Sequence, residues 1–484
     1  MNENHRHILL AVASLVPQPE RITSFPDLAG RPYDGIQTNE AAIVYLNRLL
    51  NGGLDRIFLI VSDEVMERTV AGPGSPTHYE FLCKRLAQED ATLPERIETI
   101  RVKNDAQIDG TLRGITRAAD HVLAYQQQDA GSSLILSADM TGGYRYSSMM
   151  MLSVIQLLRY SGIELGHVYY TDFYRPGIND ATSLERTFEM INGANEFVSF
   201  GSVQALMDYF EHTECEPSSE LSDLLIAMQE FSDTIKICQT NRIESDLAVL
   251  KEKIDAFEQS HSDNLQERLF TSILTTIKRE YAALLAPERD KLDIIEWCIE
   301  KGFLQQALTL CTEWIPIFLV DDMRIIVPAS RRVKEAALLS PKKALGSSWE
   351  KQFVTGRVHA PGLGPLPLTA AFSAYPAYKD VAPVDPADPI VQRTQGRWTP
   401  VYGGIRRGLN HGHMKASRPG PSIIRCLHRY FILTVLRNQT NHANIQDSTK
   451  KSLPVAASDI IYWMRDTLKQ LRILKTMKLA KHRT

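Results

Sequence analysis

Short apolar runs alternate with amphipathic stretches between Ile8 and about Asp172. The runs have the length of buried strands, and the stretches between them repeat apolar residues at helical spacing. Strands are predicted over residues 8–15, 56–62, 97–102, 133–137 and 166–170, and helices over residues 39–50, 78–88, 107–125 and 144–160. This alternation is typical of βα units. Residues 1–180 are therefore predicted to form an α/β Rossmann-like domain with a mostly parallel sheet.

After about Ser183 strand-like runs become rare, and long helical periodicities take over. Residues 219–257 repeat apolar positions at the spacing of a helix with one buried face. Further helices are predicted over residues 266–285, 292–312, 422–436 and 458–479. The pattern divides the chain into the α/β domain 1–180, a helical connector 181–215 and an all-α domain 216–484.

Prolines are frequent between about Ile317 and Pro421, in a stretch that is also rich in Gly and Ser. Because proline ends helices and removes a backbone donor, this composition disfavours another packed helical layer. An extended insertion or loop is predicted over residues 317–421 of the all-α domain.

The composition, 44% hydrophobic and 23% charged, is that of a soluble globular protein. A net charge of −3 excludes a polybasic coat, so any contact with nucleic acid must be local. Six cysteines without a C-x-x-C pair indicate neither a zinc site nor a disulfide framework, but thiols in a reducing compartment. The first apolar run is too short for a secretory signal or a membrane span. The cytoplasm is therefore expected, without membrane contact.

The turn Ala138–Arg145 lies where a predicted strand meets a predicted helix. Gly142 and Gly143 would let backbone N–H groups approach an anion at the helix N-terminus. A tight turn that only requires positive φ explains two glycines equally well. Asp139 would repel a phosphodiester, so it is assigned to orienting the turn by accepting backbone N–H bonds, with contact to ligand ribose hydroxyls as the alternative.

A second motif, Arg437-Asn438-Gln439-Thr440-Asn441-His442, follows an apolar helix. Metal-free RNA cleavage needs a group that manages the proton of the ribose 2′-hydroxyl and a cation that stabilises charge on phosphorus, and histidine and arginine supply them. The spacing alone also fits a polar helix end, and Arg406 with His411 and Arg407 with His413 are competing pairs. Those pairs lie in residues 403–413, which are predicted to be loop-like.

Five positions turn an ideal helix by about 500°, so Arg437 and His442 do not share one helical face. Two copies meeting across a twofold axis would place two arginines and two histidines around one cleft. The motif therefore predicts a homodimer.

The two motifs together resemble the CARF–HEPN ribonucleases of type III CRISPR systems. The Asp-x-Thr-Gly-Gly-x-Arg turn lies on the Rossmann-like domain, and Arg-Asn-x-x-x-His lies on the helical domain. Residues 188–197, with Gly201 shortly after them, also look like the segment that joins the two domains in this family. A glycine-histidine version of the turn is common in the family, and here Gly143 takes the place of the histidine.

The resemblance implies a CARF-like sensor, a helical connector and an all-α HEPN-like effector domain with the insertion. A dimer would bind cyclic oligoadenylate as allosteric activator and then cut single-stranded RNA to a 2′,3′-cyclic phosphate, with no metal and no cofactor. Arg437, Asn438 and His442 would be catalytic, with Asn438 supporting the placement of the other two. The implied ligand-binding residues are Ser14, Leu15, Asn104, Gln107, Asp139, Thr141, Gly142, Gly143, Tyr144 and Arg145.

Three other functions are considered. The helical half could bind nucleic acid or a partner protein without nuclease activity, or the sensor domain could itself degrade the cyclic ligand. A dinucleotide oxidoreductase is set aside, because the first turn, residues 13–19, has no G-x-G-x-x-G. The basic C-terminal segment from Arg465 to Arg483 is interpreted as a solvated helix end that could also guide RNA.

Overall fold

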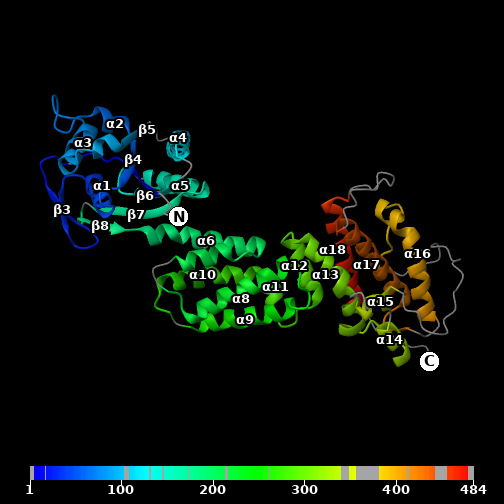
Figure 1. The fold of residues 1–484 in the computed structure, drawn as a ribbon. Coiled ribbons are helices and arrows are strands. Elements are labelled where there is room, and N and C mark those ends of the chain that lie inside the picture. The colour runs from blue at the N-terminus through cyan, green and yellow to red at the C-terminus, as the bar shows by residue number, and fades with distance from the viewer. Residues whose placement is uncertain are drawn as a thin grey trace. The chain divides into compact units, whose positions relative to one another are not determined.

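The computed structural model describes residues 5–16, 18–102, 108–129, 132–143, 146–172, 174–212, 216–260, 262–339, 348–355, 381–410, 414–441 and 455–477. Internal contacts divide the chain into two units, Met1–Glu189 and Met190–Thr484 (Figure 1). The first is an α/β unit and the second is helical. Within the described residues, no helix is long and apolar enough to cross a bilayer.

A six-stranded sheet forms the centre of the first unit, with the order β5-β4-β1-β6-β7-β8. Its strands are β1 His5–Val12, β4 Leu54–Val61, β5 Ile97–Arg101, β6 Ser133–Asp139, β7 Glu164–Asp172 and β8 Gly177–Asp180. Every neighbouring pair is parallel except β7 and β8. The five predicted strands and the mostly parallel sheet are thus confirmed.

Helices cover both faces of this sheet (Figure 1). Ile8, Leu10 and Val12 of β1 pack with α4 Ile108–Gln127 and α5 Ser147–Tyr160. Leu9 and Ala11 face the other way, toward α1 Thr38–Leu49 and α3 His78–Glu89. A strand buried on both faces is a continuous apolar run, which is why the sequence predicted it.

The chain runs from β1 to β4 and β5 on one side, and then crosses back to β6 on the other side of β1. The strand order therefore reverses between β1 and β6. In open α/β sheets ligands bind at such a reversal, outside the carboxyl ends of the strands. The segments after Val12 and after Asp139 flank this position.

Five short elements of the first unit were not predicted. The hairpin β2 Thr23–Pro26 with β3 Pro32–Gly35 lies between β1 and α1. The others are α2 Asp63–Glu67, the 3₁₀ turn η1 Leu93–Arg96 and strand β8. All have five or fewer residues, too few to show a period in the sequence.

The second unit is built from helices around one hydrophobic core that extends from Met190 to Leu474. Its helices begin with α6 Thr182–Phe200, which contains the boundary between the units, and α7 Gln204–Glu211. The others are α8 Ser219–Lys236, α9 Ile243–Gln259, α10 Leu265–Glu280, α11 Ala282–Leu285, α12 Lys291–Glu300, α13 Leu304–Ile317, η2 Phe318–Asp322, α14 Arg331–Leu338, α15 Trp349–Val354, α16 Pro389–Asn410, α17 Gly420–Asn441 and α18 Ala457–Thr476. Strands β9 Ile326–Pro328 and β10 Met414–Ala416 form a small antiparallel pair.

Three helices predicted as continuous are each divided in two. The stretch 266–285 forms α10 and α11, on either side of Tyr281. The stretch 219–257 forms α8 and α9, separated at Cys238, whose φ of 54° is left-handed. The stretch 292–312 forms α12 and α13, separated at Gly302 with a φ of 78°. A left-handed residue ends a helix without disturbing the apolar spacing around it, so periodicity alone does not detect the break.

The prediction of an extended insertion over residues 317–421 is wrong for part of that stretch. Residues 340–347 and 356–380 lie outside the described part, but α14, α15 and α16 are helices. Pro389 is the first residue of α16, a position where its missing N–H is tolerated. Val391, Trp398 and Ile405 are buried at helical spacing. Arg406 therefore lies on a helix and not in a loop, while residues 411–413 are outside the described part.

Lowering the pH from 7 to 5 is expected to destabilise the second unit through His428. This side chain is buried on α17 with its ring stacked on Trp398, the ring centres 4.4 Å apart. Burial, helped by Arg429, lowers the pKa of His428 from 6.5 to about 3. Between these two pKa values the unfolded chain binds a proton at His428 and the folded chain does not. The contribution of neutral His428 to the free energy of unfolding is therefore complete above pH 6.5 and is lost as the pH falls toward 3. The loss between pH 7 and 5 is about 2 kcal/mol.

Urea unfolding followed by tryptophan fluorescence measures this loss in the full chain. All five tryptophans, Trp297, Trp314, Trp349, Trp398 and Trp463, lie in the second unit, so the signal reports that unit alone. His428→Phe retains a ring to stack and removes the titration. If the free energy of unfolding depends on pH equally in this variant and in the unchanged chain, His428 is not the group responsible.

Candidate functional site

Asp139 ends strand β6 at the reversal of strand order and is fully buried. Its carboxylate accepts hydrogen bonds from Thr141 N at 3.0 Å, from Thr141 Oγ1 at 2.5 Å and from Asn39 Nδ2 at 2.6 Å. Burial raises the pKa of Asp139, and the hydrogen bonds from Thr141 and Asn39 oppose that rise. Asp139 thus orients the turn by accepting a backbone N–H, as its position in the sequence predicted.

Thr141 connects the turn to the neighbouring strand β7. Its hydroxyl donates to Asp139 and accepts the backbone N–H of Thr171 at 2.8 Å. Two buried oxygens at this edge, Thr171 Oγ1 and Gln37 Oε1, have no hydrogen-bond partner among the described residues. Buried polar atoms are rarely left unpaired, so this edge of the sheet can accept further donors.

Gly142 and Gly143 are required by close packing of the turn on β1. A β-carbon on Gly142 would overlap the Val12 carbonyl oxygen and lie 2.6 Å from the Val12 carbonyl carbon. Gly143 has a φ of +84°, and a β-carbon there would lie 2.6 Å from Val12 Cγ1 and also meet Ser147. The backbone therefore explains both glycines, and the histidine that is common in the resembling family at the position of Gly143 would be strained here.

Three side chains hold the segment after β1. They belong to Asn39 of α1, to Gln37, which precedes α1, and to His78 of α3. Ser14 N donates to Asn39 Oδ1 at 2.8 Å, and Gln37 Nε2 donates to the Ser14 carbonyl oxygen at 2.7 Å. Val16 N donates to Nδ1 of His78 at 3.0 Å, and burial, with Arg68, lowers the pKa of His78, which favours the neutral acceptor. Ser14 and Leu15 are half-buried beside the turn.

The structure therefore brings together Ser14, Asp139, Thr141, Gly142 and Gly143 through Val12 and Asn39. Asn39 was missed as a site residue, although it was the first residue of the helix predicted over 39–50. A polar residue at the start of that helix was the available signal. The predicted ligand residues Asn104, Gln107, Tyr144 and Arg145 lie outside the described residues.

Arg437 and Asn438 lie near the C-terminal end of α17, and His442 lies outside the described residues. Asn438 is exposed and Arg437 is half-buried, with its Nε atom buried and without a hydrogen-bond partner among the described residues. Burial raises the pKa of the Cys238 thiol, and the positive charge of Arg437 opposes that rise. The guanidinium therefore lies near the junction of α8 and α9.

Residues 187–284 match the family model described as CRISPR-associated protein MJ1674, second domain. This match supports a CRISPR-associated protein. The matched segment runs from the middle of α6 to α11, so it covers neither the turn after β6 nor the end of α17. A comparison with curated proteins gave no match.

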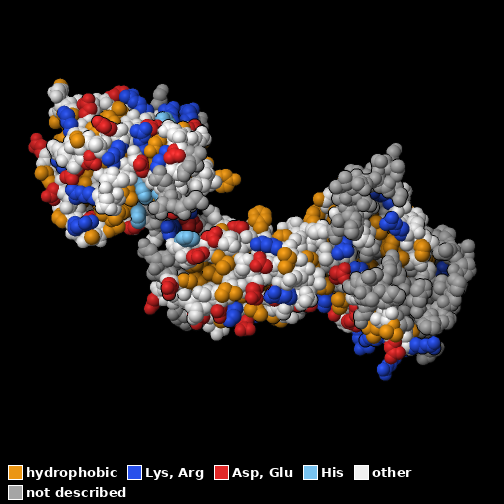
Figure 2. Space-filling view, viewed as in Figure 1, with side chains coloured by type: hydrophobic (Ala, Val, Ile, Leu, Met, Phe, Trp, Pro, Cys, Tyr) orange, Lys and Arg blue, Asp and Glu red, His pale blue; other side chains and the backbone are white. Residues whose placement is uncertain are grey.

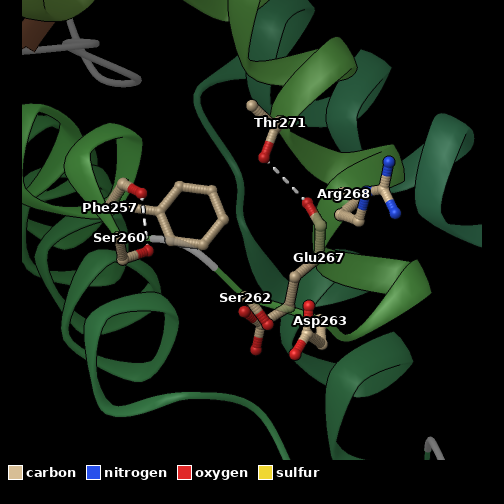
Figure 3. A pocket seen from close by; sticks show the side chains of 7 residues that line it. All are labelled: Phe257, Ser260, Ser262, Asp263, Glu267, Arg268 and Thr271. Carbon is tan, nitrogen blue, oxygen red and sulfur yellow. Dashed lines mark hydrogen bonds between the residues drawn. The ribbon is translucent and has the colours of Figure 1, made fainter.

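A pocket of about 290 Å³ lies within the matched segment, where α9 ends and α10 begins (Figure 3). It is lined by Phe257, Ser260, Ser262, Asp263, Glu267, Arg268 and Thr271. The buried Glu267 carboxylate accepts Ser218 N at 2.6 Å and Ser218 Oγ at 3.0 Å, so it already holds the start of α8. Among the described residues, no group of three His, Cys, Asp or Glu side chains could hold a metal ion.

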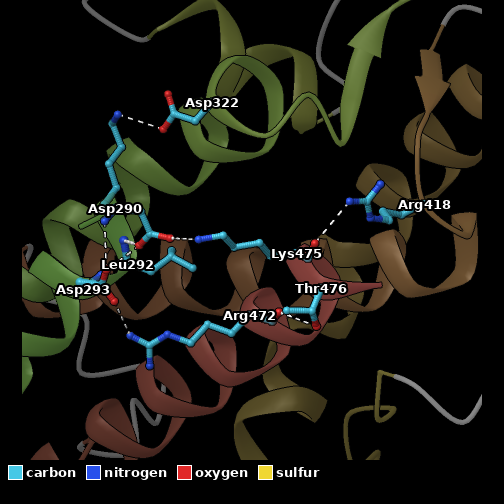
Figure 4. Close-up of polar contacts among 9 residues, drawn as sticks. Asp290, Leu292, Asp293, Asp322, Arg418, Arg472, Lys475 and Thr476 are labelled. Carbon is cyan, nitrogen blue, oxygen red and sulfur yellow. Dashed lines mark hydrogen bonds and ion pairs between the residues drawn. The ribbon is translucent and has the colours of Figure 1, made fainter. Parts of the chain in front are cut away.

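The basic residues of α18 are partly neutralised. Arg472 binds Asp293 of α12 at 3.0 Å, and Lys475 binds Asp290 at 2.8 Å (Figure 4). Arg472 also binds Glu296 of α12 at 2.7 Å. Arg465 and Lys469 are exposed on the same helix, whereas residues 478–484 are outside the described part. On the face in Figure 2, cationic and anionic side chains are interspersed. The described part of this segment therefore joins two helices and does not form a continuous cationic strip.

Proposed function

We propose that this CRISPR-associated protein is a metal-independent endoribonuclease that cyclic oligoadenylate activates, acting on single-stranded RNA in type III antiviral defence. The observation that carries the proposal is the position of the Asp139–Gly143 turn. It lies at the reversal of strand order in a parallel sheet, where α/β proteins bind ligands. The match of residues 187–284 supports the CRISPR context in which such an activator is made.

The contacts of the turn are compatible with an anionic activator. Asp139 is buried and accepts three hydrogen bonds, so its charge is turned away from the surface. Ser14, Leu15 and Thr141 are partly accessible at the same edge. Tyr144 and Arg145 follow the turn in the sequence, and such side chains stack on adenine and pair with phosphate.

Cleavage is assigned to Arg437 and His442, with Asn438 supporting their placement. His442 would take the proton of the ribose 2′-hydroxyl, whose oxygen attacks the adjacent phosphorus and displaces the 5′-oxygen of the next nucleotide. The departing 5′-oxygen would take up a proton from water and leave as a hydroxyl. Arg437 would stabilise the charge that develops on phosphorus. The expected products are a 2′,3′-cyclic phosphate and a 5′-hydroxyl, and no metal ion takes part.

A homodimer would complete the nuclease site from two copies of the motif. Helix α5, which follows the turn directly, carries the exposed apolar residues Met149, Leu157 and Tyr160 at helical spacing. Apolar side chains exposed together on one helix favour burial against a partner. A second copy seated on α5 would link the activator turns of the two chains.

An RNA cleavage assay in EDTA, with cyclic tri-, tetra- and hexa-adenylate added separately, tests this function. We expect one ring size to stimulate cleavage and to leave 2′,3′-cyclic phosphate ends. Stimulation by none of the rings would contradict the proposal and favour a sensor whose helical half binds nucleic acid or a partner. Conversion of the ring to linear product in the same tubes would instead indicate degradation of the ligand by the sensor unit.

A further inference from the structure

The side chain of Asn39 joins the two segments that flank the reversal of strand order. Its Oδ1 atom accepts Ser14 N at 2.8 Å, on the segment that follows β1. Its Nδ2 atom donates to the Val12 carbonyl oxygen at 3.0 Å and to Asp139 Oδ2 at 2.6 Å. The residue is fully buried. One planar amide thus sets the distance between the end of β1 and the turn after β6.

Few other side chains could make this set of contacts. The position requires one acceptor and two donors in a single short planar group, which an asparagine amide supplies. Aspartate would keep the acceptor for Ser14, but it would lose both donors and place a second carboxylate beside Asp139. Alanine would leave the Ser14 N–H and one Asp139 oxygen without their buried partner.

We propose that Asn39 is a positioning residue for the activator. It keeps Ser14 and Leu15 at a fixed spacing from Thr141 and Gly143, so that one ligand can contact both segments without first ordering them. This inference rests on the proposed function, because it assigns the two segments to the same activator. It predicts that Asn39 determines the affinity for the activator and leaves the cleavage chemistry unchanged.

The same helix offers a matched control. Asn47 lies eight residues after Asn39 on α1 and is also buried. Its side chain bonds to Asp90 at 3.4 Å and accepts from Arg96 at 3.3 Å, away from Ser14 and Asp139. Asn47→Ala therefore removes a buried asparagine from α1 without touching either segment.

Activator titration of RNA cleavage in the full chain separates positioning from folding. For Asn39→Ala we expect the half-maximal activator concentration to rise at least about tenfold, because the two segments must be ordered on binding, while the rate at saturation stays within about twofold. Asn47→Ala should change neither value by more than about twofold. A merely structural role would lower the saturated rate instead. Gln37→Ala, which removes only the bond to the Ser14 carbonyl oxygen, is a milder second variant and should raise the half-maximal concentration several-fold.

Hydrogen exchange without activator is the second measurement. Peptides covering residues 12–16 and 139–143 should both exchange faster in Asn39→Ala and remain unchanged in Asn47→Ala. Unchanged titration in both Asn39→Ala and Gln37→Ala would overturn the proposal, as would faster exchange in only one segment. If no ring activates the unchanged chain, the proposed function fails, and calorimetric binding of the three rings then decides the role of Asn39. If the unchanged chain binds none of them, both proposals are wrong.

Discussion

His442→Ala is expected to lower the rate of RNA cleavage by about 1,000-fold at saturating activator, because the 2′-hydroxyl loses the group that takes its proton. Arg437→Ala should have an effect of similar size through the charge on phosphorus. Initial rates on a labelled single-stranded RNA measure the loss. Calorimetry should show unchanged affinity of both variants for the activator, since the turn after β6 lies in the other unit.

The competing motif supplies the control for this prediction. His411→Ala disrupts the pair of Arg406 and His411 and should leave cleavage within about twofold of the unchanged chain. Tryptophan fluorescence checks that Arg437→Ala leaves the second unit folded, which matters because Arg437 is half-buried near Cys238. Normal cleavage by His442→Ala, or loss of cleavage in His411→Ala alone, would contradict the assignment.

The sequence predicted most of the α/β unit because its central strands β1, β4 and β6 are largely buried on both sides. Residues of β1 alternate between the two faces of the sheet, and each face is covered by helices, so its buried part, Ile8–Val12, is a continuous apolar run. The strands β2, β3 and β8 have four residues each, which is too short to form a recognisable apolar run in the sequence. In the helical unit, the apolar spacing predicted the helical segments but not the breaks at Cys238 and Gly302, which depend on backbone conformation.

For the candidate site, local contacts could be predicted and distant ones could not. Asp139 bonds to the backbone two residues away, a pattern typical of Asp in turns. The bond from Asn39 to Asp139 spans 100 positions, and it depends both on the packing of α1 against the sheet and on the register of β1 against β6. The prediction of a loop in the proline-rich stretch was wrong for a related reason. The burial of Trp398 against His428 stabilises α16 despite its prolines, and the amino-acid composition of the stretch does not reveal that contact.

Gly142→Ala is expected to raise the half-maximal activator concentration by about 100-fold and to lower the free energy of unfolding of the first unit by about 3 kcal/mol. The added β-carbon would overlap the carbonyl oxygen of Val12, which is backbone and cannot rotate away. The turn must therefore separate from β1, and the bonds from Asn39 to Val12 and Asp139 would be strained together. Activator titration gives the first effect, and urea unfolding followed by circular dichroism gives the second.

Gly177→Ala on β8 is the matched control in the same unit, because the nearest atom to its added β-carbon would be 3.8 Å away, an ordinary contact. It should change the half-maximal activator concentration by less than about twofold. The tryptophan signal of the helical unit should be the same for both variants, since all five tryptophans lie there. If Gly142→Ala lowers the free energy of unfolding of the first unit yet binds the activator normally while that unit is folded, the turn is only a bend in the chain. Weaker binding with little loss of stability would instead indicate that the turn contacts the activator directly.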